Sequence, residues 1–364
     1  MGDMFHRLAP YIQDYIYANN WTELREIQVA ACHAVFDTDE NLLLSSGTAS
    51  GKTEAAFLPV LTELYHHPSS SVGVLYISPL KALINDQFKR LDDLLAESNL
   101  PVCKWHGDAS QAEKNRLLKH PEGILQITPE SLESLLIHKR GAGVKLFYDL
   151  RFVIIDEVHY FMRDVRGVQV LCLLERLQRL AGVVPRRIGL SATLGDLTVA
   201  QSWLNSGTGR SCAAPVCGAE KQKIRLLVQR FQRADQTTPD GALDAGEAAH
   251  YEYLYRMTLD RKTILFTNSR EETELVMAHL RQLALKNKTP DVYRVHHGNI
   301  SAVLREQAED EMKSAQEKLV TGATVTLELG IYIGSLDLVV QVGTPATVSS
   351  FAQLLGRCGR RGLA

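Results

Sequence analysis

The feature that most constrains this chain is a short glycine-containing loop between an apolar run and a helix-forming run. The apolar run is Leu42–Leu44, and the helix-forming residues after the loop are Glu54–Ala56. Between them, residues 46–53 read SGTASGKT. A strand, a small-residue loop and then a helix form the context in which GKT indicates a phosphate-binding loop. A glycine-serine turn that contains GKT by chance is the alternative, and this context disfavours it.

The loop predicts a site for a nucleoside triphosphate. Ser50, Gly51 and Lys52 carry no β-branch, so their backbone N–H groups can turn inward, and the N-terminus of the following helix adds positive potential. We expect Lys52 to reach the β- and γ-phosphates and the Thr53 hydroxyl to hold Mg²⁺. The residues expected to bind the nucleotide are Gly47, Thr48, Ala49, Ser50, Gly51, Lys52 and Thr53.

Length and composition indicate a globular chain of two domains. The chain has 364 residues, of which 45% are apolar, and its formal charge of −2 neither favours nor excludes nucleic acid. No window approaches about 18 uncharged apolar residues, which excludes a membrane-spanning helix. The six cysteines include no CxxC pair, which argues against zinc and iron–sulfur sites. Free thiols and the lack of a basic and apolar leader lead us to expect a cytoplasmic protein.

Strand-like runs rich in Val, Ile and Leu alternate with helix-like stretches along the chain. In the first part these runs are residues 41–46, 73–78, 101–106, 123–128, 151–157 and 187–193. In the second part they are residues 224–228, 263–267, 292–296, 318–325 and 338–342. This alternation predicts an α/β fold with mainly parallel sheets that are covered by helices on both faces.

A change of composition between the two sets of runs marks a domain boundary. Residues 205–210 are rich in turn residues, and residues 232–249 are polar with many Gly, Ala and Asp. We therefore predict a first domain over residues 1–210, and a linker with a second domain over residues 211–364. Together with the phosphate-binding loop, the pattern predicts two RecA-like domains in tandem.

A pair of adjacent carboxylates forms the second strong signal. Residues 152–155 are apolar strand residues, and Asp156 and Glu157 follow them directly. In a parallel sheet this places both carboxylates at the carboxyl edge, where ligands of α/β proteins bind. Asp156 is expected to help hold the Mg²⁺ carried by Thr53, and Glu157 to orient and deprotonate the attacking water. A solvated strand end is the alternative, and the phosphate-binding loop upstream disfavours it.

Short motifs in a fixed order resemble the core of superfamily 2 helicases. In the first domain they are Gln28, the phosphate-binding loop, Ser78–Leu83 (segment Ia), Thr128–Ser131 (Ib), the DEVH box Asp156–His159 and the SAT segment Ser191–Thr193. In the second domain they are Phe266–Arg270 (motif IV), His297 with Gly298, Thr324–Gly334 (V) and Gln353–Arg361 (VI). Each motif alone is weak, but their common order is specific. The resemblance implies two RecA-like domains with the ATP and nucleic-acid clefts between them.

The resemblance assigns further residues to ATP. Gln28 falls where such proteins recognise adenine, and Gly330 and Gln353 lie in the segments similar to motifs V and VI. Arg357 and Arg360 are one helical turn apart, so both point the same way from a short helix. We interpret them as arginine fingers for the γ-phosphate, where an arginine can be worth ~10³–10⁵ in rate. A basic end of a surface helix is the alternative.

A track for a single strand is expected at small-residue turns, because hydroxyls, backbone amides and cations hold phosphates without reading sequence. The residues assigned to this track are Ser78, Pro79, Lys81, Thr128, Pro129, Thr267, Asn268, Ser269, Arg270, His297, Gly298 and Thr324. Ordinary strand-to-helix connections are the alternative for such turns. The resemblance implies that His159, Ser191 and Thr193 couple the ATP state to the grip on the strand.

Two segments indicate which group of superfamily 2 helicases the chain resembles most. Arg166–Gln169 after the DEVH box and Leu327–Gly330 in motif V look most like the large helicase-related (Lhr) group. Residues 159–164 and the ending of motif VI also resemble RNA helicases that serve the exosome. Tyr332 stands where motif V usually has an acid, which puts ribose recognition or coupling in doubt. The Lhr resemblance implies further C-terminal domains that could engage protein partners, so we expect a fragment of a longer protein.

The sequence thus predicts a nucleic-acid-dependent ATPase that uses ATP and Mg²⁺, moves along single-stranded DNA or RNA and unwinds duplexes. One alternative is a translocase that remodels protein–nucleic-acid complexes without strand separation, as the motor of a repair or defence assembly. A second alternative is an ATP-gated nucleic-acid clamp, which the full set of predicted catalytic residues disfavours. ATPase assays with and without a single strand, followed by a strand-displacement assay, distinguish the three. The choice between DNA and RNA stays open.

Overall fold

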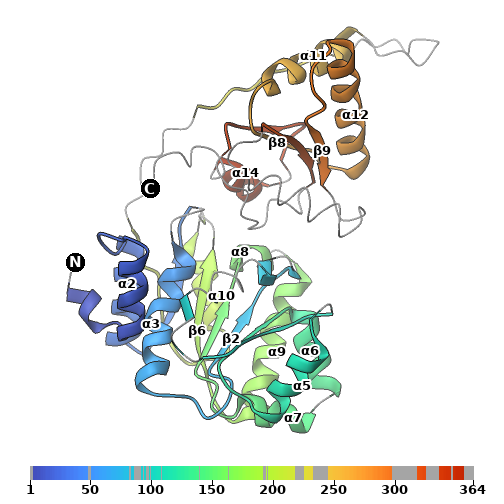
Figure 1. Cartoon of the computed structure of the whole chain (residues 1–364). Coiled ribbons are helices and arrows are strands. Elements are labelled where there is room, and N and C mark those ends of the chain that lie inside the picture. The colour runs from blue at the N-terminus through green and yellow to red at the C-terminus, as the bar shows by residue number, and fades with distance from the viewer. Residues whose placement is uncertain are drawn as a thin grey trace. The chain divides into compact units, whose positions relative to one another are not determined.

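The computed structural model divides the chain into two compact units, Met1–Ala219 and Glu220–Ala364 (Figure 1). The structure describes residues 3–47, 51–81, 83–85, 92, 94–95, 98, 100–107, 109–138, 140–162, 164–191, 194, 196–217, 225–232, 245–296, 318–324, 336–345 and 347–355. Of residues 140, 142, 348, 349, 352 and 353 it describes the backbone alone. Each unit is described by itself below.

A seven-stranded sheet forms the centre of the first unit, and all of its strand pairs are parallel. The strand order is β3-β4-β2-β5-β6-β1-β7. The strands are β1 (Asn41–Ser45), β2 (Val74–Ile77), β3 (Val102–Trp105), β4 (Ile124–Ile127), β5 (Phe152–Ile155), β6 (Arg186–Ser191) and β7 (Cys212–Ala213). Because every strand runs the same way, the carboxyl ends of all seven meet at one edge of the sheet.

Helices cover both faces of this sheet, as the continuous apolar runs of its strands predict. One face carries η1 (Asp3–Arg7), α1 (Pro10–Ala18), α2 (Glu26–Asp37) and α3 (Lys52–His66). The other carries α5 (Gln111–Lys119), α6 (Pro129–His138), α7 (Arg140–Phe147), α8 (Val158–Phe161), α9 (Val165–Ala181) and α10 (Leu197–Asn205). Figure 1 shows α2 and α3 on one side of the strands, and α6 and α9 on the other. Neighbouring residues of β1 alternate between the two cores: Leu42 and Leu44 pack in the first, and Leu43 packs in the second.

The second unit repeats this design with four described strands. They are β8 (Thr263–Phe266), β9 (Tyr293–His296), β10 (Val320–Ala323) and β11 (Leu338–Gln341), parallel throughout, in the order β11-β8-β10-β9. The described helices are α11 (Ala245–Thr258), α12 (Arg270–Lys286) and α14 (Val348–Leu355). The predicted α/β class with mainly parallel sheets is therefore confirmed in both units.

One predicted strand is wrong. Residues 225–228, the described part of the apolar run 224–228, belong to no strand of the described structure. Leu226, Leu227 and Val228 are exposed, with Val228 84% accessible to solvent. An apolar run becomes a strand only where another strand pairs with it, and a single sequence does not reveal whether such a partner exists.

The sequence also missed strand β7. It consists of Cys212 and Ala213, which pair with Asn41 and Leu42 of β1. Two residues are too few to produce a period-2 pattern. The predicted division after residue 210 thus assigns to the linker a strand that pairs within the first sheet.

No helix in the part of the chain that the structure describes is long and apolar enough to cross a membrane.

Candidate functional site

The carboxyl edge of the first sheet brings together the predicted phosphate-binding lysine and the predicted carboxylates. β6 lies between β1 and β5, so the loop after β1 and the turn after β5 are two strands apart. Lys52 begins α3, and its Nζ donates to the carbonyl oxygens of Ser46 at 2.6 Å and Gly47 at 2.7 Å. The lysine therefore folds back over the entrance of its own loop.

Electrostatics tie Lys52 to the acidic pair. Burial lowers the pKa of Lys52, and the negative charges of Glu157, Asp156 and Glu54 act against this shift. A cation held close to two carboxylates and loop carbonyls can exchange those partners for phosphate oxygens when a nucleotide binds. The sequence motifs assign Lys52, Asp156 and Glu157 to one site. In the structure the charges of Asp156 and Glu157 act on Lys52, which agrees with that assignment.

Asp156 is buried, and hydrogen bonds from Tyr76 and from the Glu157 backbone orient its carboxylate. The hydroxyl of Tyr76 donates to its Oδ2 at 2.5 Å, and the backbone N–H of Glu157 donates to its Oδ1 at 3.0 Å. Asp156 is only 8% exposed and Tyr76 is fully buried on β2. Because β2 lies beside β5, with Tyr76 opposite Ile154, the tyrosine is well placed to reach Asp156 two residues further along.

Sequence reasoning missed Tyr76. The one signal in the sequence was a tyrosine within a fully buried strand, because a buried tyrosine hydroxyl usually finds a hydrogen-bond partner. Its ring packs against that of Phe57 from α3, with 5.8 Å between the ring centroids. Tyr76 therefore contacts both the helix that follows the phosphate-binding loop and the carboxylate after β5.

Glu157 adopts a backbone conformation that side-chain-bearing residues rarely take. Its φ of 52° and ψ of 48° lie in the left-handed region. Such conformations cost of order 1–3 kcal/mol and persist where the surrounding structure imposes them. The turn directs the chain from β5 into α8 immediately after the two carboxylates. Among the described site residues, Glu157 is the one non-glycine residue with a positive φ.

A buried histidine links Glu157 to the end of β6. Nδ1 of His159 lies 3.1 Å from the Ser191 hydroxyl and 3.4 Å from Oε2 of Glu157. His159 is 4% exposed and Ser191 is fully buried. Glu157, His159 and Ser191 thus form a connected polar chain, and the sequence placed two of its members, His159 and Ser191, in a coupling role. The third predicted coupling residue, Thr193, lies outside the described residues.

Gln28 lies against the phosphate-binding loop, although it comes from α2. It is 2% exposed, and its Oε1 accepts the backbone N–H of Arg25 at 2.9 Å. A Cβ added to Gly51 would lie 3.1 Å from Nε2 of Gln28 and 3.4 Å from the Arg25 side chain. Gly51 also has a positive φ of 81°, so both its conformation and its surroundings require glycine.

The donor atoms at this edge fit Mg²⁺. Thr53 supplies a hydroxyl from the first turn of α3, and Asp156 supplies a carboxylate whose orientation is fixed. Mg²⁺ prefers oxygen donors and takes its other ligands from water and substrate phosphates. Among the described residues no group of three or more His, Cys, Asp and Glu could hold a metal ion.

The predicted track of the first unit begins at the same edge. Ser78 and Pro79 follow β2 and are buried, and the Ser78 hydroxyl has no hydrogen-bond partner among the described residues. Lys81 is exposed, and its Nζ would be 3.2 Å from a Cβ added to Gly107. The Lys81 side chain therefore lies over the turn after β3.

Thr128 and Pro129 join β4 to α6. The Thr128 hydroxyl donates to the Ser131 hydroxyl at 3.1 Å and accepts the Ser131 N–H at 3.4 Å. Pro129 is the first residue of the helix and is buried. Thr128 thus serves the start of α6, the position where a hydroxyl stabilises a helix. The turn is therefore an ordinary connection between a strand and a helix, and this does not conflict with a role in binding a nucleic-acid strand.

In the second unit the predicted motif IV lies at the carboxyl edge of its sheet. Thr267 is buried and its hydroxyl lies 2.5 Å from that of Thr273, while Ser269 caps α12 by accepting the Glu272 N–H. Asn268 is exposed, and its Nδ2 donates to the Thr344 carbonyl at 3.1 Å. The remaining members at this edge are the exposed Arg270, which begins α12, and the buried Thr324, which follows β10.

Other predicted site residues lie outside the described part of the chain. They are Thr48, Ala49, Ser50, Thr193, His297, Gly298, Gly330, Arg357 and Arg360. Gln353 lies in α14, where the backbone alone is described. Their roles stay predictions.

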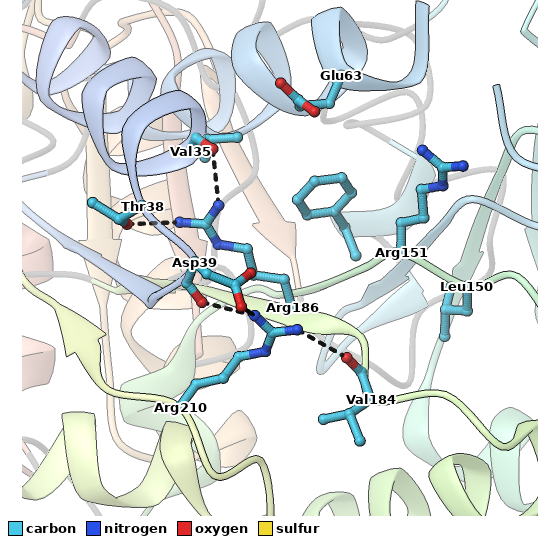
Figure 2. Close-up of a pocket in the computed structure, with 10 residues that line it drawn as sticks. Val35, Thr38, Asp39, Glu63, Leu150, Arg151, Val184, Arg186 and Arg210 are labelled. Atoms are coloured by element: carbon cyan, nitrogen blue, oxygen red, sulfur yellow. Dashed lines mark hydrogen bonds and ion pairs between the residues drawn. The ribbon is translucent and has the colours of Figure 1, made fainter. Parts of the chain in front are cut away.

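A cavity lies at the opposite, amino-terminal edge of the first sheet, and two of the arginines that line it, Arg186 and Arg210, already have protein partners. Its volume is about 380 Å³ (Figure 2). The Arg186 guanidinium donates to the carbonyls of Val35 at 2.9 Å and Ala34 at 2.6 Å, so it caps the end of α2. Arg210 forms an ion pair with the Asp39 carboxylate. These cations hold the first unit together, and the predicted site lies at the other edge.

Comparison with known proteins gives a matching family model within each of the two units. Residues 25–201 match the family model of the DEAD/DEAH box helicase, and residues 248–362 match that of the helicase conserved C-terminal domain. The ATP-dependent helicase Lhr-Core of Methanothermobacter thermautotrophicus is 33% identical over 99% of this chain and 43% of its own length. The Lhr helicase/uracil glycosylase of Escherichia coli is 32% identical over 88% of this chain and 24% of its own.

The solved structures that this chain resembles are also helicases. Helicase Lhr of Mycobacterium smegmatis, bound to ssDNA and AMP-PNP, superposes with a TM-score of 0.78 at 28% identity, over 98% of this chain and 46% of that one. The DUF1998 helicase MrfA, bound to DNA and AMPPNP, superposes with a TM-score of 0.80 at 26% identity, over 100% and 50%. The chain spans less than half the length of the curated relatives cited here, 43% and 24%. This chain belongs to the superfamily 2 helicases of the DEAD/DEAH type, and within them it is similar to the Lhr group.

Proposed function

We propose that this chain is the motor core of an ATP-dependent helicase that hydrolyses ATP to move along a nucleic-acid strand and to separate duplexes. The observation that carries the proposal is the grouping of Lys52, Asp156 and Glu157 at the carboxyl edge of the first sheet. Family membership supports it, because the related proteins are named ATP-dependent helicases.

ATP binding begins with Lys52. Its Nζ leaves the carbonyls of Ser46 and Gly47 for the β- and γ-phosphates, while Gln28 beside Gly51 contacts the adenine. Thr53 and Asp156 hold Mg²⁺, which when bound neutralises charge on the phosphate oxygens. Burial and the two hydrogen bonds on Asp156 keep its carboxylate in one orientation.

Hydrolysis uses Glu157 as the base. Its carboxylate accepts a proton from the attacking water as the new P–O bond forms to the γ-phosphorus and the bond to the leaving ADP breaks. Arg357 and Arg360 stabilise the charge that develops on the γ-phosphate. The contacts among Glu157, His159 and Ser191 then give the chemical state a route to the end of β6.

The partner is single-stranded or partly duplex DNA or RNA. The Lhr and MrfA structures were solved with ssDNA or DNA bound, which supports a nucleic-acid track here as well. In the first unit the exposed cation Lys81, which follows the turn at Ser78 and Pro79, supplies a contact to phosphates.

The protein works in the cytoplasm. Five described cysteines, Cys32, Cys103, Cys172, Cys212 and Cys217, are unpaired thiols, which suits a reducing compartment. Neither alternative function, a translocase without strand separation nor a clamp without turnover, gains support from an observation of its own.

Two substitutions test the catalytic assignment. Glu157→Gln keeps the shape of the side chain but cannot accept a proton, so ATP binding should persist while turnover falls by about 10²–10⁴-fold. Lys52→Ala removes the cation for the phosphates and should weaken ATP binding itself. Equilibrium titration with a fluorescent ATP analogue and steady-state phosphate release measure the two effects separately.

Glu63→Gln is the matched control, because Glu63 lies near the opposite end of α3 and lines the cavity at the amino-terminal edge. It should leave both quantities unchanged. Turnover by Glu157→Gln at the wild-type rate would show that another group serves as the base.

A further inference from the structure

One arginine outside the predicted sites joins three segments of the first unit. Arg166, in the first turn of α9, donates from Nη2 to the Pro79 carbonyl at 3.0 Å and from Nε to Oε1 of Glu130 at 2.9 Å. Pro79 belongs to segment Ia, and Glu130 lies in the first turn of α6, in segment Ib. Its guanidinium carbon also lies 5.6 Å from the ring centroid of Tyr160 in α8.

Local structure holds Arg166 in this place. The Asp164 side chain accepts the Arg166 backbone N–H at 2.8 Å and thereby caps the start of α9. The next residue, Gly167, allows α9 to lie directly against α8, since a Cβ there would be 2.0 Å from the Phe161 carbonyl oxygen. The cap and the close approach leave the arginine side chain pointing across the short α8 toward the two track segments.

A second pair, one turn further along the same two helices, isolates what is special about Arg166. Gln169 of α9 donates to Glu133 of α6, as Arg166 does to Glu130. Both pairs therefore connect α9 with α6. Arg166 differs from Gln169 in that it also donates to segment Ia, through the Pro79 carbonyl.

The contribution of Arg166 to overall stability is small. Its side chain is 25% exposed and that of Glu130 is 56% exposed, and ion pairs at such positions contribute little to folding because water competes for both partners. The bond to the Pro79 carbonyl has a different consequence. It fixes the orientation of a backbone group in a turn whose neighbouring hydroxyl, Ser78, has no partner among the described residues.

We propose that Arg166 is a positioning residue that holds segments Ia and Ib in register with each other and with the helix that follows the catalytic carboxylates. This inference rests on the proposed function, because it assumes that Ia and Ib contact the strand. Arg166 acts through Pro79 and Glu130 rather than by binding phosphate itself. Through Tyr160 in α8, close to His159, the same side chain connects the track to the ATP-binding edge.

The test compares Arg166→Ala with Gln169→Ala in the intact chain, using an oligo(dT) strand and an oligo(U) strand as probes. Strand binding is measured by fluorescence anisotropy and stimulation by steady-state ATP hydrolysis, each referred to the variant's own rate without a strand. Arg166→Ala should raise the strand concentration for half-maximal binding and stimulation about tenfold, which corresponds to 1.4 kcal/mol. Gln169→Ala should leave the strand concentrations for half-maximal binding and for half-maximal stimulation within about twofold of wild type, a much smaller change than the tenfold expected of Arg166→Ala.

Salt dependence distinguishes positioning from a direct phosphate contact. A residue that binds phosphate contributes roughly 0.7 to the slope of log affinity against log salt. Arg166→Ala should weaken binding at every salt concentration with the wild-type slope, and Glu130→Gln should weaken it in the same direction. A slope reduced by about 0.7 would identify Arg166 as a phosphate ligand and overturn the inference.

Two outcomes separate this inference from the proposed function. If the wild-type chain neither binds nor responds to either strand, the proposed function fails. If the wild-type chain responds and Arg166→Ala behaves like Gln169→Ala, the proposed function stands and the positioning role of Arg166 is refuted. Circular dichroism and thermal unfolding of each variant verify that all the proteins compared are folded.

Discussion

Single residues at the ATP-binding edge are oriented before any ligand arrives. Lys52 is held by two loop carbonyls, Asp156 by Tyr76 and a backbone N–H, and His159 by Ser191. A buried polar group that loses its partner costs about 1–3 kcal/mol, so the buried Asp156 and His159 keep their arrangement. Lys52 is held more loosely, as expected of a cation that is proposed to exchange its loop carbonyls for phosphate oxygens. Preorganisation of this kind favours phosphoryl transfer, because that reaction depends mainly on positioning and electrostatics.

The thiols should differ sharply in reactivity. Burial raises the pKa of Cys32 to about 12 and that of Cys103 to about 11, and both are buried, whereas Cys172 on α9 is exposed. The thiolate is the reactive form, so at pH 8 the first two stay protonated as well as inaccessible. Among these three, iodoacetamide should alkylate Cys172 first in the native protein.

Peptide mapping by mass spectrometry measures this order, with the protein unfolded in urea as the reference in which all three react. Cys172→Ser should remove the fast phase that belongs to this residue. Alkylation of Cys32 as fast as Cys172 in the native state would contradict the packing of α2 against the first core.

The sequence predicts residues whose role follows from local order, and it fails for residues whose partner is distant in the chain. Asp156 and Glu157 follow directly after a strand, and Lys52 ends the short loop after another, so local order is enough to place all three at the carboxyl edge. The role of Tyr76 depends on β2 lying beside β5, which only the folded sheet establishes. Arg166 is similar, because Pro79 and Glu130 lie far upstream of it.

At the scale of elements, α8 follows the turn that carries Asp156 and Glu157, and α9 packs closely against α8. Gly167 permits this contact, and replacing it with alanine would force a Cβ to within 2.0 Å of a backbone oxygen. Backbone cannot yield as a flexible side chain does, so the two helices must separate. Such overpacking typically costs about 1–3 kcal/mol.

Gly167→Ala should therefore lower the free energy of unfolding by about 1–3 kcal/mol. Gly141→Ala is the matched control, since Gly141 also lies in a helix, is exposed, and has nothing within 4 Å of an added Cβ. It should leave stability unchanged or increase it by up to about 1 kcal/mol through helix propensity. Urea unfolding followed by circular dichroism gives both values, and equal effects of the two substitutions would refute the steric account.

Strands in both units follow from runs of Val, Ile and Leu, because a sheet covered on both faces needs apolar residues on both. Two elements could not be predicted from such runs. The run 224–228 has the composition of a strand but no strand structure in its described residues, and β7 is a strand too short to show a pattern. In each case pairing decided the outcome, and pairing is not encoded in the composition of one segment.

At the scale of the whole molecule, each of the two helicase family models matches residues within one of the two compact units. The tandem arrangement was predictable, because a phosphate-binding loop opened the first set of strands and a turn-rich break preceded the second. The boundary after residue 210 stays a prediction, although β7 extends the first sheet to Ala213.

The central claim is that this chain converts ATP hydrolysis into action on a nucleic-acid strand, and steady-state ATP hydrolysis with and without single-stranded DNA or RNA tests it most directly. The proposed function predicts a low rate for the wild-type chain alone, a clear rise when one of the two strands is added, and strand displacement from a partial duplex under the same conditions. Substitution of Glu157 by Gln should abolish the stimulated rate. A hydrolysis rate that neither DNA nor RNA changes would contradict the claim.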